Sequence, residues 1–380
     1  MMEWSIRSLL NPVITRLLIY GVNPIDVEYV VSAVENKNHI NSRSLEKSWL
    51  EEWEKKALRY KTMAQECEKN NNTISAREFY FYAAQCYYAV FLINLSGIEP
   101  KKRVYMEYAS LYRKSTEYYP AKVEYMEIPI DGENTISGYL HHPVSKIQAE
   151  SPCVIIYSGL GSCKEEMNTL ARPLADRGIA VFIPDMPGNG ESLFVHDTKC
   201  RVHNLNSAFT KIPDFLEKRE DIKKGAFGVY GLCMGGGYAY RAACVDPRYA
   251  FCVTFFPLFI TQVDTKTTPQ WMKQGEWYNY QTGGVATEDF MNEMQALEEG
   301  SFKCPYLFIH GKYDNWMTIE LAMKLFDKAQ GEKEKIIIEQ EPVYSNQQVV
   351  THTMPVGEQL HWVRQVAADW AAAHFGMMKK

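Results

Sequence analysis

No C-x-x-C pair occurs in this sequence, although nine cysteines are spread along its 380 residues. Their number is odd and their spacing is irregular, so they do not indicate the disulfide framework of a small secreted domain. Reduced thiols in a cytosolic protein are the simplest interpretation. We therefore expect a cytoplasmic location.

A long uncharged hydrophobic run is also missing. Residues 1–24 are apolar in patches, but Glu3, Arg7 and Arg16 interrupt them. This segment is too short and too charged to span a membrane, and it lacks the layout of a secretory signal. The net charge of −5 gives no reason to expect a nucleic-acid partner or a membrane-surface partner. We therefore expect neither nucleic acid nor membrane as a partner.

Aromatic residues, in contrast, are abundant, with 24 tyrosines and 8 tryptophans. The chain is long enough for a large core and a second domain. Apolar residues in the first third recur at helical spacing with charged residues between them, as at Leu45, Trp49, Trp53 and Leu58. We predict an all-helical domain over residues 1–120, and this part contains no nucleotide or metal motif.

After Pro120 the pattern changes to short apolar strands that alternate with helices. Residues 122–130 and 135–143 flank a DGEN turn and predict a β-hairpin. Further strands are expected at 153–160, 180–185, 225–231, 251–257, 306–311 and 335–340. Helices are expected at 164–177, 205–219, 234–245, 318–329 and 356–375. This alternation predicts an α/β core over 121–380, a mostly parallel sheet covered by helices on both faces.

One stretch of this core, GVYGLCMGGGYAYRAA at 228–243, predicts a strand, a sharp glycine-rich turn and a helix. Cys233 stands at the apex, where a G-x-S-x-G nucleophile elbow has serine. Such a turn holds a nucleophile above the sheet, and the backbone N–H of Met234 would face the developing oxyanion. The alternative interpretation is a buried cysteine in a glycine-rich turn.

Residues with the chemistry of a catalytic acid and base follow Cys233 in the chain. Asp314 comes just after the strand 306–311, where the acid of this fold belongs, although an aspartate there also suits a helix N-cap. His352 lies in a loop and is the expected base, with His361 in the last helix as the alternative. His310, beside a glycine, is expected to be structural.

The loop after the strand 153–160 carries Gly159, Leu160 and Gly161. Its backbone is expected to supply the second oxyanion donor, the N–H of Leu160. His141 and His142 lack ligand spacing with any cysteine or carboxylate, so we expect no metal site and no cofactor.

These motifs resemble the α/β-hydrolase superfamily, above all GLGSCKEE, PDMPGNGES, GLCMGGGYAYRAA and HGKYD. They resemble the branch that has a helical N-terminal domain and includes FrsA-like esterases, 2,6-dihydroxypseudooxynicotine hydrolases and polyketide-shortening hydrolases. The resemblance implies a lid-like helical domain over the strand ends and an active site between the domains. It also implies Cys233, Asp314 and His352 as nucleophile, acid and base. The chain departs from the family pattern in having cysteine where the family has serine.

Several members of that branch cleave carbon–carbon bonds beside a ketone. The resemblance therefore implies hydrolysis of a β-diketone, ester or thioester in a polyketide-like or aromatic ketone substrate, which a carrier protein could present as an acyl group. A thioester on Cys233 also favours an acyltransferase or cyclase. A non-catalytic binding protein on the same fold stays an alternative, as does an engineered serine-to-cysteine replacement. For the quaternary structure, the sequence is compatible with a homodimer.

An aromatic insertion at about 257–290 is expected to line the substrate pocket, because tyrosine and tryptophan stack on flat substrates. The side chains expected there are Trp271, Trp277, Tyr278 and Tyr280, with Gly159 below them. The alternative is a surface loop with its own hydrophobic cluster. From the helical domain, Tyr87, Tyr88 and Arg113 are expected to complete the pocket.

Overall fold

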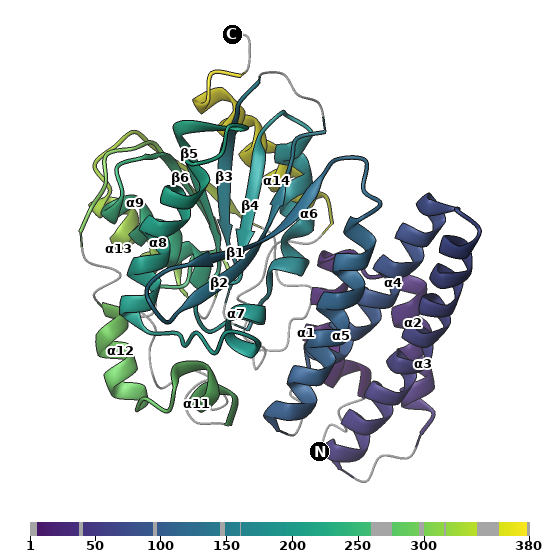
Figure 1. The fold of residues 1–380 in the computed structure, drawn as a ribbon. Helices are drawn as coiled ribbons and strands as arrows, with labels where there is room; N and C mark the ends of the chain where they lie inside the picture. Colours follow the sequence, from purple (N-terminus) through teal and green to yellow (C-terminus); the bar gives the residue numbers. More distant parts are fainter. Residues whose placement is uncertain are drawn as a thin grey trace. The chain divides into compact units, whose positions relative to one another are not determined.

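The computed structural model describes residues 6–37, 41–93, 97–144, 149–159, 161–259, 276–295, 300–314, 317–339 and 357–377. The chain divides into two compact units, Met1–Val123 and Glu124–Lys380. Figure 1 shows the helices and strands of both units.

The first unit is helical throughout its described part. Its helices are α1 (Ile6–Ile19), α2 (Pro24–Glu35), α3 (Ser42–Lys69), α4 (Thr73–Phe91) and α5 (Ile98–Thr116). Each helix packs against the next one along the chain. Helix α3 begins with a capping box, in which Asn41 and Ser44 bond each other's backbone N–H groups.

The tryptophans of α3 form part of the core of the helical unit. Trp49 and Trp53 are fully buried, and Trp49 Nε1 donates to the carbonyl of Ala89 at 2.8 Å. Leu58, predicted on the same face, is 65% exposed, and Ala57 is buried in its place. The prediction was wrong because five residues after Trp53 the helix has turned well past the buried face, whereas four residues nearly restore it.

The second unit is built on one eight-stranded sheet with the order β1-β2-β4-β3-β5-β6-β7-β8. The strands are β1 (Val123–Pro129), β2 (Thr135–His141), β3 (Ser151–Tyr157), β4 (Ala180–Pro184), β5 (Ile222–Leu232), β6 (Tyr249–Phe255), β7 (Tyr306–Gly311) and β8 (Lys333–Ile338). Strand β2 pairs with β4 in antiparallel fashion, and the pairs from β4 to β8 are parallel. The predicted fold class is confirmed.

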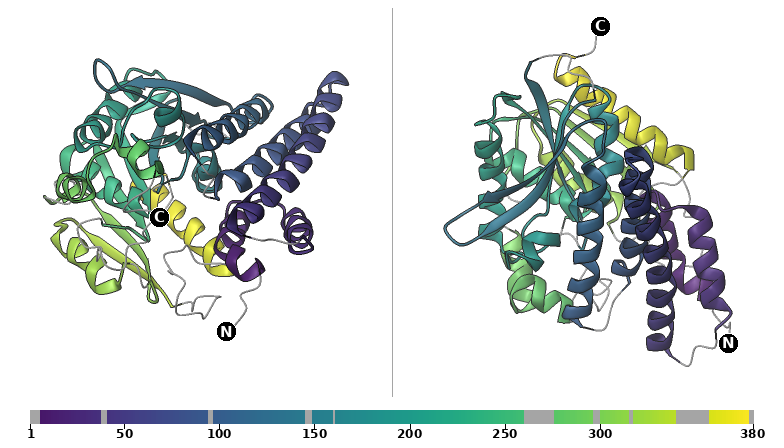
Figure 2. Two further views of the ribbon diagram at one scale, coloured as in Figure 1. Left: turned by 90° about the horizontal axis from the view of Figure 1, so that it is seen from below. Right: turned by 45° about the vertical axis from the view of Figure 1, so that its right-hand side comes forward.

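Helices cover both faces of this sheet, as the fully buried strands β3 and β4 require. They are η1 (Lys164–Met167), α6 (Asn168–Ala175), α7 (Gly190–Phe194), α8 (Val202–Leu216), α9 (Met234–Val245), α11 (Glu276–Thr282), α12 (Thr287–Gln295), α13 (Ile319–Lys328) and α14 (Gly357–His374). Helix α14 packs with α6 on one face, while α8 packs with α9 on the other (Figures 1 and 2).

The parallel strands place several loops at one edge of the sheet. Strands β3, β4, β5 and β7 end at Tyr157, Pro184, Leu232 and Gly311, so the segments that follow all start at this carboxyl edge. In open parallel sheets, this edge is where ligands bind. Among the described residues, no helix has both the length and the apolar character needed to cross a membrane.

Candidate active site

Cys233 lies between β5 and α9 in a backbone conformation that side chains rarely adopt, with φ 57° and ψ −125°. Such a conformation costs about 1–3 kcal/mol and persists only where the surroundings enforce it. Here the backbone is held on both sides. Its N–H donates to Phe255 O at 3.1 Å, and its carbonyl accepts from the N–H groups of Gly236 and Leu258, both at 2.8 Å. The residue as a whole is half-buried.

The glycines around Cys233 allow the turn to close. A methyl group on Gly231 would lie 2.0 Å from the carbonyl oxygen of Gly235, and one on Gly235 would lie 2.2 Å from that of Tyr157. Because backbone atoms cannot give way as a flexible side chain can, only glycine fits at these positions. The predicted sharp strand–turn–helix geometry at Cys233 is therefore present in the structure.

The loop after β3 approaches this turn. A methyl group on Gly159 would lie 3.1 Å from Cys233 Cβ and 3.5 Å from Sγ. Met234 is the first residue of α9, and the first N–H groups of a helix have no partner within it. The two segments expected to supply oxyanion donors thus flank one side chain. Leu160 itself lies outside the described residues.

Asp314 follows β7 and is buried. Its Oδ1 accepts from the N–H of Met317 at 2.8 Å, a bond that orients the carboxyl group. This bond also helps form the turn before α13. Asp314 therefore has part of the helix-capping role that was the alternative interpretation of this residue. Thr318 is the N-cap residue of α13, and its side chain makes no capping bond within the described chain.

His310 has a structural position, as expected. It is fully buried on β7, and its Nε2–H donates to the carbonyl of Met317 at 2.8 Å. The same nitrogen stands 4.0 Å from Asp314 Oδ2. The ring therefore fastens the turn that carries Asp314.

The catalytic histidine stays a prediction. His352 lies outside the described residues, although β8, whose end precedes it in the chain, pairs with β7 beside Asp314. His361 is described and lies exposed in α14. The structure thus gives the local geometry of Cys233 and of Asp314 but not that of His352.

The structure describes only some of the residues of the aromatic insertion that were predicted to line the pocket. Trp271 lies outside the described residues, and of Trp277 only the backbone, in α11, is described. Tyr278 is buried edge-on against Phe290 of α12, with ring centroids 5.7 Å apart. Tyr280 is half-buried and stacks on Phe194 of α7. The position of Tyr278 therefore fits the alternative interpretation, in which the insertion forms its own hydrophobic cluster.

The helical unit carries the other residues predicted for the pocket. Tyr88 is fully buried, with its ring against those of Tyr20 and Tyr108, which is the position of a packing residue. Tyr87 and Arg113 are half-buried. Their proposed contact with substrate depends on where the helical unit sits and stays a prediction.

Sequence reasoning missed a buried ionic cluster next to the carboxyl edge. Lys164 Nζ lies 2.8 Å from Glu165, 2.7 Å from Asp185 and 2.7 Å from Glu191, and the Lys164 side chain has no exposed surface. Asp185 Oδ1 also accepts from the N–H of Lys164. The cluster ties the loop after β3 to the loop after β4. One signal in the sequence could have indicated this cluster. Charged residues, in KEE and in DMPGNGE, come shortly after apolar strands.

Charges in this cluster are strongly perturbed. Burial raises the pKa of Glu165 to about 7, against the opposing effect of the Lys164 ammonium. Burial would by itself lower the pKa of Lys164, but the carboxylates of Asp185, Glu165 and Glu191 outweigh it and raise that pKa. Lys164 is therefore charged, and burial favours the protonated form of Glu165.

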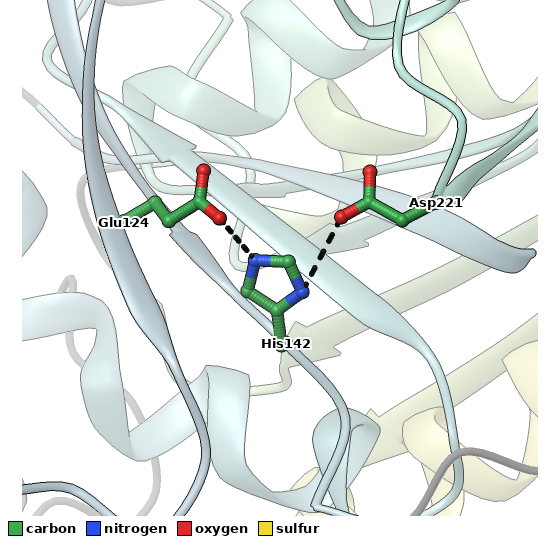
Figure 3. A group of neighbouring side chains, drawn as sticks. All are labelled: Glu124, His142 and Asp221. Atoms are coloured by element: carbon green, nitrogen blue, oxygen red, sulfur yellow. Dashed lines mark hydrogen bonds and ion pairs between the residues drawn. The ribbon is translucent and has the colours of Figure 1, made fainter.

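Neither of the two groups that could in principle hold a metal ion, among the described residues, fits one. Lys164 already fills the space between the carboxylates of the ionic cluster. In the other group, the ring of His142 lies between Glu124 and Asp221 (Figure 3), 3.1 Å and 3.7 Å away. Arg219 pairs with both of those carboxylates.

The two carboxylate partners of His142 could not be recognised from ligand spacing in the sequence. Glu124 and Asp221 are far from it in sequence, and only the pairing of the strands brings them together. This group lies at the start of β5, at the end of that strand remote from Cys233. Its neighbour His141 is buried, and burial lowers the pKa of that ring to about 4. His141 is therefore neutral at pH 7, and burial also lowers the pKa of His142, against the opposing effect of the two carboxylates.

Comparison with known proteins places this geometry in a family. The sequence profile of the FrsA-like esterases matches residues 17–260, and that of the prolyl oligopeptidase family matches residues 166–376. The 2,6-dihydropseudooxynicotine hydrolase of Paenarthrobacter nicotinovorans is 28% identical over 280 residues, covering 72% of each chain. The 20-hydroxy-prefusarin hydrolase of Gibberella moniliformis is 27% identical over 275 residues, which are 70% of this chain and 64% of that protein.

A solved structure gives the same result for the fold. The 2,6-dihydroxy-pseudo-oxynicotine hydrolase superposes with a TM-score of 0.74 at 21% identity, covering 95% of both chains. Together, these comparisons show that the chain belongs to the FrsA-like esterase family, with a core that the prolyl oligopeptidase family also matches, and that it is a hydrolase of the α/β-hydrolase superfamily.

Proposed function

We propose that this hydrolase uses Cys233 as a nucleophile, with His352 as base and Asp314 as acid, to cleave a carbon–carbon, ester or thioester bond beside a carbonyl group. The observation that carries the proposal is the strained backbone of Cys233, held at φ 57° with Gly159 against its side chain. Strain of this kind is retained where a function requires it. A packing cysteine would gain nothing from it.

In the first half of the reaction, His352 takes the proton of the Cys233 thiol, and Sγ attacks the carbonyl carbon of a β-diketone. The carbonyl π electrons move onto oxygen, where the N–H groups of Leu160 and Met234 stabilise the charge. The tetrahedral intermediate collapses, the adjacent carbon–carbon bond breaks, and its electron pair leaves as an enolate. That enolate takes the proton from His352, which gives a ketone and a thioester on Cys233.

In the second half, His352 removes a proton from water, and the resulting hydroxide adds to the thioester carbon. Collapse of this intermediate expels the Cys233 thiolate, which recovers its proton from the imidazolium. The products are one ketone and one carboxylic acid per water consumed. Asp314 keeps the imidazole in the required tautomer throughout.

A second candidate, acyl transfer or cyclisation, is favoured by one observation, the cysteine at position 233 in place of the serine of the family pattern. A thioester is a better acyl donor to amine and carbon nucleophiles than an oxyester. The thiolate also forms at lower pH than an alkoxide. For the substrate we propose a polyketide-like or aromatic ketone, free or presented by a carrier, and for the quaternary structure we keep the homodimer as a proposal.

The test is a product analysis with 1-phenyl-1,3-butanedione as the probe. The unaltered protein should release acetophenone and acetate, or benzoate and acetone, and Cys233→Ala should abolish this. Cys304→Ala is the matched control, a half-buried cysteine whose thiol pKa is raised to about 12 by burial, and it should keep full activity. Cleavage that survives Cys233→Ala would contradict the proposal.

Cys233→Ser separates the two candidates when an amine acceptor is added. We expect the serine variant to be slower and to lose more transfer to the amine than hydrolysis, because an oxyester is the poorer donor. A serine variant that is faster in both reactions would mean that cysteine is a degenerate or engineered replacement at this position.

A further inference from the structure

We infer that Asn189 is a positioning residue that aligns the oxyanion loop, and that Gln281 of α11 in turn holds Asn189. The inference rests on the proposed function, since it assigns Asn189 a role in stabilising the charge that develops when Cys233 attacks a carbonyl. Neither residue was among those predicted from the sequence.

Asn189 bridges the loops that follow β4 and β3. It is buried, and its Nδ2 donates to the carbonyl of Gly159 at 3.2 Å and faces Ser158 Oγ at 3.4 Å. Asn189 is also the N-cap residue of α7, yet its side chain makes no capping bond within the described chain. An asparagine at an N-cap ordinarily bonds its own helix. Here the amide is directed to Gly159 instead.

The carbonyl of Gly159 shares one planar peptide unit with the N–H of the next residue, and in a trans peptide these two groups point in opposite directions. A hydrogen bond that fixes the carbonyl therefore fixes the direction of the N–H. Gly159 is also the residue packed against Cys233. The Gly159 carbonyl also accepts from the N–H of Ser162 at 3.3 Å, so Asn189 and Ser162 together fix the direction of the N–H that follows Gly159.

Gln281 orients the amide of Asn189. Its Nε2 donates to Asn189 Oδ1 at 3.2 Å and to the carbonyl of Gly188 at 2.9 Å. Gln281 is itself buried, and its backbone carbonyl accepts from the N–H of Cys200. Because the oxygen of Asn189 faces a donor, its NH₂ group must face the Gly159 carbonyl. The hydrogen bonds thus run in one direction, from α11 through Asn189 to the loop beside Cys233.

This direction makes Asn189→Asp an informative variant. The carboxylate has almost the same size and still accepts from Gln281, but it has no donor for Gly159 and places two oxygens face to face. The matched control is Asn204→Ala. Asn204 is another buried asparagine, whose Nδ2 donates to the carbonyl of Lys199 at 2.9 Å, and it has no bond to Gly159 within the described chain.

The experiment compares two reactions of the same thiol. With p-nitrophenyl acetate, Sγ attacks a carbonyl, an oxyanion forms, and p-nitrophenolate leaves. With iodoacetamide, Sγ displaces iodide and no oxyanion forms. Loss of one oxyanion donor costs about 100- to 1000-fold in rate, so misdirecting one should cost about 10- to 100-fold. We expect Asn189→Asp to slow acetylation of Cys233 by that factor and to leave alkylation within about twofold.

Asn204→Ala should leave the ratio of the two rates unchanged. An unchanged ratio in Asn189→Asp would overturn the inference, as would a parallel loss of both reactions in a folded protein. If Asn189→Asp does not fold, Gln281→Glu provides the same comparison, because its carboxylate would face the oxygen of Asn189 and turn the amide. An unchanged ratio there would overturn the inference. Failure of the unaltered protein to be acetylated at Cys233 would instead contradict the proposed function.

Discussion

Gly159 and Cys233 come from different loops, and their closeness leaves little room for a side chain on Gly159. A methyl group there would lie 3.1 Å from Cys233 Cβ, which is tighter than ordinary van der Waals contact, and 3.5 Å from Sγ. The space beside the sulfur is therefore kept open by the absence of a side chain. A substrate carbonyl that reacts with Cys233 needs this space.

Gly159→Ala should reduce kcat by at least about tenfold, because the added methyl group displaces the thiol or the loop by a few tenths of an ångström and misaligned catalytic groups lose rate steeply. The backbone of Gly159 is not in the left-handed region, so the free energy of unfolding should change only through this overpacking, by about 1–3 kcal/mol. The control is Gly132→Ala, where a methyl group meets nothing within 4 Å. Equal kcat in both variants would count against the site.

The strain at Cys233 predicts a difference between two inactive variants. Alanine keeps a Cβ in the unfavourable conformation, whereas glycine relieves it. Cys233→Gly should therefore be more stable than Cys233→Ala by about 1 kcal/mol, even though glycine normally costs stability through the entropy of the unfolded chain. Urea unfolding of both variants measures the difference. A glycine variant that is the less stable of the two would show that the turn is unstrained.

The ionic cluster predicts a pH dependence of stability. Burial raises the pKa of Glu165 to about 7 from its ordinary value of 4.5, so between these values the folded protein holds a proton that the unfolded chain has released. The free energy of unfolding therefore falls as pH rises from about 4.5 to about 7, with a slope of at most about 1.4 kcal/mol per pH unit. Urea unfolding at several pH values measures it.

Glu165→Gln should remove this contribution, because the amide imitates the protonated carboxyl at every pH. Its stability relative to the unaltered protein should rise between pH 4.5 and pH 7. Glu166→Gln is the control. Glu166 is also buried, but its carboxylate accepts from the backbone N–H of Cys163. Parallel stability curves for the unaltered protein and Glu165→Gln would contradict the assignment.

We predict opposite effects on activity for the alanine variants of the two candidate bases, His352 and His361. His352→Ala should reduce kcat by at least about 100-fold, since general base catalysis is lost. His361→Ala should keep kcat within about twofold, because its ring is exposed on α14. Steady-state hydrolysis of p-nitrophenyl acetate measures both. The reverse order of effects would assign the base to His361 instead.

The sequence was sufficient to predict those features that a short local pattern determines. The glycines around Cys233 and the aspartate after β7 were recognisable because short segments encode a turn and a strand end. Helix α7 was not predicted, since it lies within a glycine-rich segment. Leu58 was misplaced by one residue of helical phase.

The ionic cluster and the Gln281–Asn189 contact could not be predicted for a different reason. Asp185 is 21 residues from Lys164, and Gln281 is 92 residues from Asn189. Their meeting depends on how strands β3 and β4 pair and on where α11 packs. A local pattern contains no information on either.

The most direct test of the central claim is intact-protein mass spectrometry after brief exposure to p-nitrophenyl acetate, followed by peptide mapping. The account predicts one added acetyl group on Cys233, absent from Cys233→Ala and removed by water on further incubation. The half-buried Cys244 is the internal comparison, since burial raises its thiol pKa to about 12. An acetyl group on Cys244 or elsewhere while Cys233 stays unmodified would contradict the account.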